Sequence, residues 1–190
     1  MDIATQRLPI VEKLWHGDTK AIVGSVLLAV VFSINMQITE RLDAATTGGT
    51  FPWLGSMFIN LWFPVACIYF GLTGALIAAN FNPIIAVLTA THPLAPSFFF
   101  ANMAYTIPFT FIFRFVARSG REITYPVFAL ICIICQFGPT TVLLALWVFL
   151  LQLPTWQIVV FYIIGIAVAI PGSAMGYYFW KYVERSGLME

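Results

Sequence analysis

The chain has 190 residues, of which 61% are hydrophobic and only 9% are charged, and its formal net charge is +1. Soluble domains carry about 25% charged residues, so this composition excludes an ordinary soluble domain and predicts an all-α integral membrane protein. The small net charge and the absence of any run of Lys or Arg predict that nucleic acid is not a partner.

Residues 1–19 mix charges of both signs and lack a cleavable apolar core, so we expect a cytoplasmic segment and no secretory signal. A transmembrane helix needs about 20 apolar residues. The chain offers six such stretches within a membrane domain at 20–185, before a short cytoplasmic tail at 186–190. The predicted spans are 20–39, 53–70, 74–91, 97–117, 124–150 and 157–181.

The connections between these spans differ in character. The second and third spans are separated only by YFGLTGA, in which Gly71 and Gly74 predict a tight helical turn. The stretch ERLDAATTGGTFP at 40–52 is the longest connection, and we expect it to be a mobile loop.

The distribution of Lys and Arg predicts the orientation of the chain. With six spans and a cytoplasmic N-terminus, only Arg41 lies outside, so we expect both termini to be cytoplasmic. The basic residues that this arrangement places inside are Arg7, Lys13, Lys20, Arg114, Arg118, Arg121, Lys181 and Arg185.

Catalytic and cofactor motifs are missing from the sequence. It contains no GxxxxGK[ST], HExxH, GxSxG or GxGxxG, and the middles of the predicted spans lack ionisable residues. Cys132 and Cys135 form a CxxC inside an apolar run, where cysteine behaves as a small buried hydrophobe. We therefore expect no enzyme activity, no metal and no cofactor.

Uncharged polar and aromatic residues are the remaining candidates for function. Small-molecule sites combine apolar walls with a few hydrogen-bonding groups, so this set predicts a site for a neutral or weakly charged heterocycle. The same residues could instead link helices or lie in an aromatic belt at the membrane interface. The candidates are Asn35, Asn82, Asn102, Tyr105, Gln136, Thr140, Trp147 and Tyr162.

Each of the last five spans contains an internal proline, at positions 64, 83, 108, 139 and 171. Kinked helices can surround a cavity, because their freed carbonyl groups need other partners. Proline is also commoner in membrane helices than in soluble ones, and the sequence leaves both explanations open.

The first span carries a small residue at every fourth position. Such a row allows another helix to approach closely in a bilayer, so we predict a contact with a partner helix there. The row consists of Ala21, Ser25, Ala29 and Ser33.

Three stretches resemble those of a known family of membrane proteins. LGSMFINLWFPVACIYFGLTGALIAANFNPIIAVL resembles its second and third helices, and PSFFFANMAYTIPFTFIFRFVAR resembles its fourth, including the Asn near the outer end, here Asn102. IPGSAMGYYFWKYVER resembles its last helix. On these stretches the chain resembles the substrate-binding S components of energy-coupling-factor (ECF) transporters.

The resemblance implies a six-helix bundle in the prokaryotic cytoplasmic membrane that binds a vitamin-like molecule beneath its first outer loop. The expected partners are a membrane coupling subunit, two ATPase subunits and the surrounding lipids, and the bundle is expected to topple in the membrane during transport. In this family an Ala-x-x-x-Ala on the first helix docks the coupling subunit. Here Ser25 stands between Ala21 and Ala29, so the spacing of small residues is kept but the strict Ala pair is not.

Two other functions fit part of the sequence. The row of small residues could be a permanent contact in a larger membrane complex, which would make the chain a structural or accessory subunit. A membrane enzyme acting on lipid or quinone is the third possibility, although no paired carboxylates, His cluster or activated nucleophile supports it.

Overall fold

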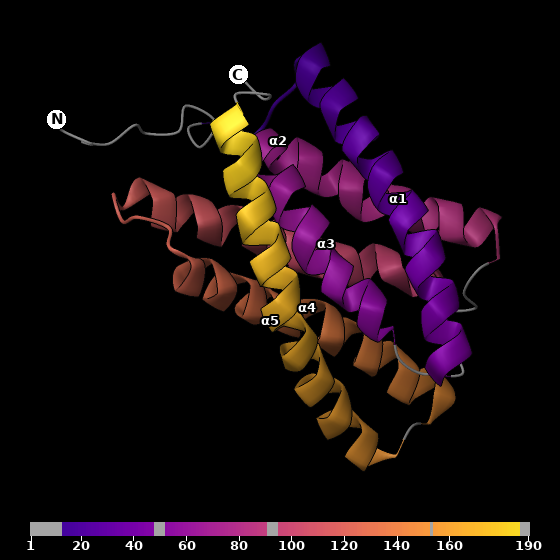
Figure 1. Ribbon diagram of the computed structural model, residues 1–190. Coiled ribbons are helices and arrows are strands. Elements are labelled where there is room, and N and C mark those ends of the chain that lie inside the picture. The colour runs from indigo at the N-terminus through magenta and orange to yellow at the C-terminus, as the bar shows by residue number, and fades with distance from the viewer. Residues whose placement is uncertain (1–12, 48–51, 91–94, 153, 187–190) are drawn as a thin grey trace, which may run out of the picture.

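Five α-helices make up most of the computed structural model, which describes residues 13–47, 52–90, 95–152 and 154–186 (Figure 1). By length and composition, each of the five is long and apolar enough to cross a membrane. The described residues form no strand beyond one isolated bridge between Trp15 and Gly71. The helices are α1 (Thr19–Thr47), α2 (Trp53–Leu88), α3 (Ala95–Arg118), α4 (Tyr125–Leu151) and α5 (Thr155–Ser186).

A break at Gly71 divides α2 into two helical arms. Gly71 has φ 60° and ψ −142°, a conformation that is favourable only for glycine. A Cβ atom there would collide with the carbonyl group of Leu14, which accepts a hydrogen bond from the Leu72 amide at 2.9 Å. The segment before α1 therefore lies against the bend and fixes its geometry.

The two arms of α2 fold back on each other at this bend. Gly74 lies against the backbone carbonyl of Ala66, eight residues earlier, whereas one straight helix would separate these residues by about 12 Å. In Figure 1 the arms diverge from the bend. They correspond to the spans predicted at 53–70 and 74–91, but the second arm ends at Leu88 and the structure joins the two as one helix.

The other helix boundaries differ from the predictions mainly in α1. Helices α3 and α4 begin and end within two residues of 97–117 and 124–150. Helix α5 is longer than the predicted span by a few residues at each end. Helix α1 continues to Thr47, so the first eight residues of the stretch predicted as a loop, 40–47, are helical.

Helix α1 packs almost entirely against α2, and this contact covers its small residues. Ala21, Ser25, Ala29 and Ser33 are all buried within the chain, and Ser25 and Ala29 have no exposed surface. The row predicted to meet a partner helix thus lies against a helix of the same chain. A separate subunit would have to displace α2 to reach it.

Helix α5 also approaches α2 closely, through a pair of glycines four residues apart. A Cβ atom at Gly172 would collide with the carbonyl oxygen of Met57, and one at Gly176 would collide with that of Asn60. Without side chains at these positions, the two backbones come into direct contact, as in other small-xxx-small pairs of membrane helices.

Aromatic rings fill the core where the helices meet. Phe109 stacks on Phe113 with their ring centroids 5.7 Å apart, and the Phe113 ring meets the edge of Trp180 at 5.4 Å. These contacts join α3 to α5 at the end of the bundle near the Gly71 bend, where the Tyr69 hydroxyl also donates to the Trp180 carbonyl oxygen. This end of the molecule is therefore tightly packed.

Asp43 holds the start of α2 in place. Its Oδ1 accepts from the Leu54 amide at 3.0 Å and its Oδ2 from the Gly55 amide at 2.9 Å. The first amides of a helix have no partner within the helix, and a carboxylate there also meets the positive end of the helix dipole. A buried carboxylate at this position therefore stabilises the contact between α1 and α2.

We expect Asp43→Ala to lower the free energy of unfolding by about 2 kcal/mol, because two buried amides lose a charged acceptor. Asp43→Asn keeps one acceptor and should lose about half as much. Denaturant unfolding of the detergent-solubilised protein, followed by circular dichroism, measures both losses. Equal stability of the Ala and Asn variants would contradict this role of the carboxylate.

Candidate ligand-binding site

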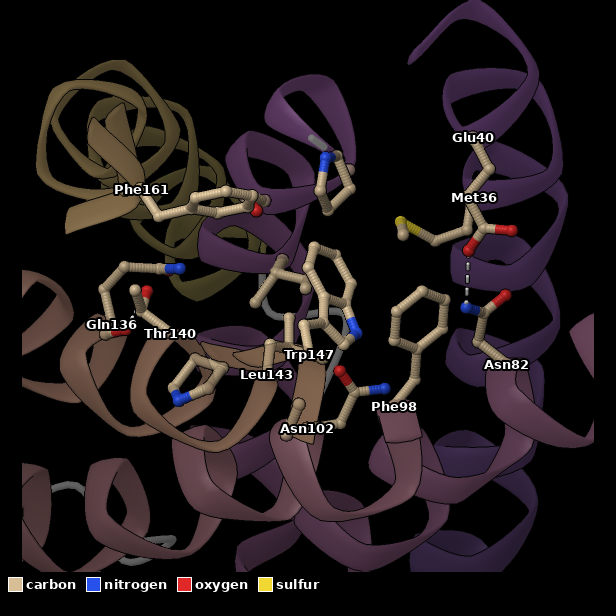
Figure 2. Close-up of a pocket in the computed structure, with 17 residues that line it drawn as sticks. Met36, Glu40, Asn82, Phe98, Asn102, Gln136, Thr140, Leu143, Trp147 and Phe161 are labelled. Carbon is tan, nitrogen blue, oxygen red and sulfur yellow. Dashed lines mark hydrogen bonds between the residues drawn. The ribbon is translucent and has the colours of Figure 1, made fainter. Parts of the chain in front are cut away.

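A cavity of about 40 Å³ lies where all five helices meet, away from the Gly71 bend (Figure 2). At about 10–15 Å³ of such volume per water molecule, it has room for roughly three waters. Its walls are mainly apolar with a few polar groups. The lining residues are Met36, Glu40, Pro52, Gly55, Ser56, Ile59, Asn82, Phe98, Ala101, Asn102, Gln136, Pro139, Thr140, Leu143, Trp147, Phe161 and Gly165.

Helix termini bring most of these side chains together. Pro52 and Gly55 belong to the start of α2, Phe98 to the start of α3 and Phe161 to the second turn of α5. Trp147 lies one turn before the end of α4, and its ring meets the edge of Phe161 at a centroid distance of 5.6 Å. The cavity therefore lies at the end of the bundle where α2, α3 and α5 begin and α4 ends.

A buried hydrogen-bond network supports the polar side of the cavity. The Tyr105 hydroxyl donates to Asn60 Oδ1 at 2.8 Å, and Asn60 Nδ2 donates to Gln136 Oε1 at 2.9 Å. Gln136 lines the cavity, whereas Tyr105 and Asn60 lie behind it with no exposed surface. Because its oxygen is engaged with Asn60, Gln136 offers its NH₂ group to the cavity.

Asn102 and Thr140 complete this polar side. Asn102 Nδ2 donates to the carbonyl oxygen of Ala79 at 3.1 Å, so its carboxamide oxygen points the other way and can accept. The Thr140 hydroxyl donates to the Gln136 carbonyl oxygen at 2.9 Å and keeps its lone pairs as acceptors. The cavity thus presents both donors and acceptors between aromatic walls.

The opposite side of the cavity holds an acidic residue. Glu40 is 3% exposed, and its Oε1 accepts from Asn82 Nδ2 at 3.2 Å, as the dashed line in Figure 2 shows. Asn82 is 1% exposed, and its Oδ1 is buried without a hydrogen-bond partner. Among the described residues that line the cavity, Glu40 is the only ionisable one.

Five of the eight candidate residues line the cavity, and three do not. The five are Asn82, Asn102, Gln136, Thr140 and Trp147. Tyr105 lies one layer behind the wall. Asn35 is half-buried on α1 and does not reach the lining, and Tyr162 pairs its hydroxyl with that of Thr141 at 2.8 Å, on an exposed side of the bundle.

The sequence reasoning missed Glu40, although the sequence contains a signal for it. Buried residues of α1 recur at intervals of three or four, and the same spacing leads on from Met36 to Glu40 and Asp43. Both acidic residues lie in the stretch predicted to be a loop, 40–52. Of the internal prolines, only Pro139 is among the lining residues.

The lining contains no arrangement typical of catalysis. No side chain with a nucleophile lies beside a histidine there. Across the described residues, no group of three or more His, Cys, Asp or Glu side chains could hold a metal ion. The described lining offers hydrogen-bonding groups, one carboxyl group and aromatic surfaces.

Comparison with known proteins identifies a similar fold. A structure described as the crystal structure of an S-component of an ECF transporter matches 92% of this chain and 89% of its own, with a TM-score of 0.61 and 13% sequence identity. No protein-family model matches the sequence, and no curated protein matches it. At this identity the likeness concerns the fold: the chain is all-helical and has the architecture of an ECF S-component.

Proposed function

We propose that this protein is the substrate-binding membrane subunit of an ECF-type transporter and takes up a vitamin or a similar small heterocycle. Separate subunits would hydrolyse ATP to drive the uptake. The observation that carries the proposal is the polar and aromatic cavity at one end of a bundle with the fold of an S-component. No nucleotide-binding motif is needed in this chain for that role.

The proposed topology has six membrane crossings, with the Gly71 bend on the cytoplasmic side. Hydrogen bonds join the bend region to the segment before α1 through Leu14, to α3 through Arg114 and to the end of α5 through Trp180. In Figure 1 the start of α1, the bend of α2 and the end of α5 lie toward the same end. The excess of Lys and Arg at that end supports a cytoplasmic location in a prokaryotic membrane.

This orientation opens the cavity toward the outer face. Glu40 and Asn82 lie near the outer ends of their helices, and Arg41 is the single basic residue on that side. A pocket for a drug-sized molecule measures about 300–1,000 Å³, far more than the cavity of about 40 Å³. Ligand entry would therefore separate the helix ends that carry Phe98, Trp147 and Phe161.

The proposed partners are a membrane coupling subunit and two ATPases. Since α2 covers the small-residue row of α1, we do not assign the coupling contact to that row. The outward face of α1 is apolar and exposed, with Leu27 62% and Ile34 59% exposed, and it suits lipid or another membrane helix equally well.

Purification from native membranes tests this function directly. We expect a tagged chain, extracted in mild detergent, to recover one membrane scaffold and two ATPases, together with a small heterocycle that mass spectrometry identifies. Recovery of an unrelated membrane assembly, with no small molecule bound, would contradict the transporter and favour a structural or accessory subunit.

A further inference from the structure

One ionisable side chain is found among the described residues that line the cavity. None of the described lining residues is basic, and Glu40 is the only acid among them. Asp43, one turn further along α1, is not among the lining residues, and both of its oxygens accept from backbone amides at the start of α2. The described lining therefore places its one carboxyl group on the side of α1.

The hydrogen-bonding groups on this side are acceptors. The Glu40 carboxylate accepts, and Asn82, having donated to it, leaves its Oδ1 buried and without a partner. A buried polar atom without a partner is unfavourable, so a group that donates to it gains more than it would in water. Glu40 and Asn82 together favour a ligand group that donates hydrogen bonds over one that accepts them.

Aromatic rings face this acidic side. In Figure 2 the ring of Phe98 lies between Trp147 and the Glu40–Asn82 pair, with Phe161 beyond Trp147. The faces of such rings are electron-rich and attract cations, and they also stack on flat rings. A carboxylate opposite aromatic walls is a combination that binds planar cations.

We infer that the ligand is a planar cation, an aromatic heterocycle whose positively charged nitrogen or N–H group is held by Glu40 and Asn82 and whose ring packs against Phe98. This inference rests on the proposed function and adds the charge of the ligand to it. The sequence predicted a neutral or weakly charged ligand, because Glu40 was not among the predicted site residues. The inference replaces that ligand with a cation.

Three pyridine rings of similar size and different charge test the inference: 1-methylnicotinamide as the cation, nicotinamide as the neutral ring and nicotinate as the anion. Isothermal titration calorimetry on the detergent-purified full chain at pH 7 measures their binding. We expect the cation to bind about tenfold more tightly than the neutral ring, and the anion to bind most weakly.

The same titrations on Glu40→Gln test the assigned residue. We expect this variant to lose about tenfold in affinity for the cation and to bind nicotinamide nearly as before. The control, Glu122→Gln, removes an exposed carboxylate from the connection between α3 and α4 and should keep the full preference. Gly165→Leu, which fills the cavity, should remove binding of all three rings.

The outcomes separate the inference from the function it rests on. If the three rings bind equally well, or if the anion binds best, the ligand is not a cation, but a small-molecule site remains. A cation preference that persists in Glu40→Gln would also overturn the assignment. Failure of all three rings to bind the wild type would overturn the inference and count against the proposed function as well.

Discussion

Replacing Gly176 with leucine is expected to destabilise the protein by more than about 3 kcal/mol, enough to prevent recovery of a folded monomer. A Cβ atom there already overlaps the Asn60 carbonyl oxygen, and the rest of the Leu side chain would push α5 away from α2. The shift would also disturb Asn60, which holds Gln136 at the cavity wall. Size-exclusion chromatography and denaturant unfolding measure the effect.

Ala167→Leu is the matched control for this prediction. Ala167 lies on an exposed part of the same helix, so the same added bulk meets no backbone. Its stability should stay within about 0.5 kcal/mol of that of the wild type. If Gly176→Leu were as stable as Ala167→Leu, the close contact between α5 and α2 would be refuted.

The second large effect is expected at the cavity itself, where Gly165→Leu should reduce ligand affinity by at least about 100-fold. A Cβ atom at Gly165 lies 3.1 Å from Thr140 Oγ1 and 3.8 Å from Gln136 Cγ. The Leu side chain would therefore occupy space beside two polar residues that line the cavity. Calorimetry with the native ligand, or with the cationic ring above, measures the loss.

Ile163→Phe provides the matched control, because Ile163 is 61% exposed on the same helix and two residues away. It adds bulk outside the cavity, and ligand affinity should change less than threefold. A folded, monomeric Gly165→Leu protein that binds as well as Ile163→Phe would show that the ligand lies elsewhere.

Much of the helical framework follows from the sequence because long apolar runs have few alternatives in a membrane. Helices α3 and α4 match their predicted ranges closely. The glycine pair in YFGLTGA marks a real break, since Gly71 adopts a conformation that other residues disfavour. Composition and spacing are sufficient for these features because each one depends on local chemistry.

The end of α1 could not be predicted in the same way. Glu40 and Asp43 are charged, and an isolated charge in a membrane helix is costly. Tertiary hydrogen bonds offset the cost of burying them. Glu40 accepts from the Asn82 side-chain amide, and Asp43 accepts from the first backbone amides of α2. The partners lie 11 to 42 residues away in the sequence, so local pattern does not reveal them.

The sequence also did not show which polar side chains point into the bundle and which point outward. These helices are apolar on nearly all faces, so periodicity does not separate lipid-facing from inward positions. Asn102 and Gln136 line the cavity, while Tyr162 lies on an exposed side with Thr141. The sequence likewise did not show which helix packs on the small-residue row of α1. Close packing against α2 and close packing against another subunit require the same small residues.

The central claim is that this cavity holds a small molecule, and mass spectrometry of the gently purified protein tests it most directly. The account predicts about one planar heterocycle per chain in the wild type and in Ile163→Phe, and none in Gly165→Leu. Wild-type protein that is consistently empty, and that binds nothing across a panel of vitamins, would contradict it.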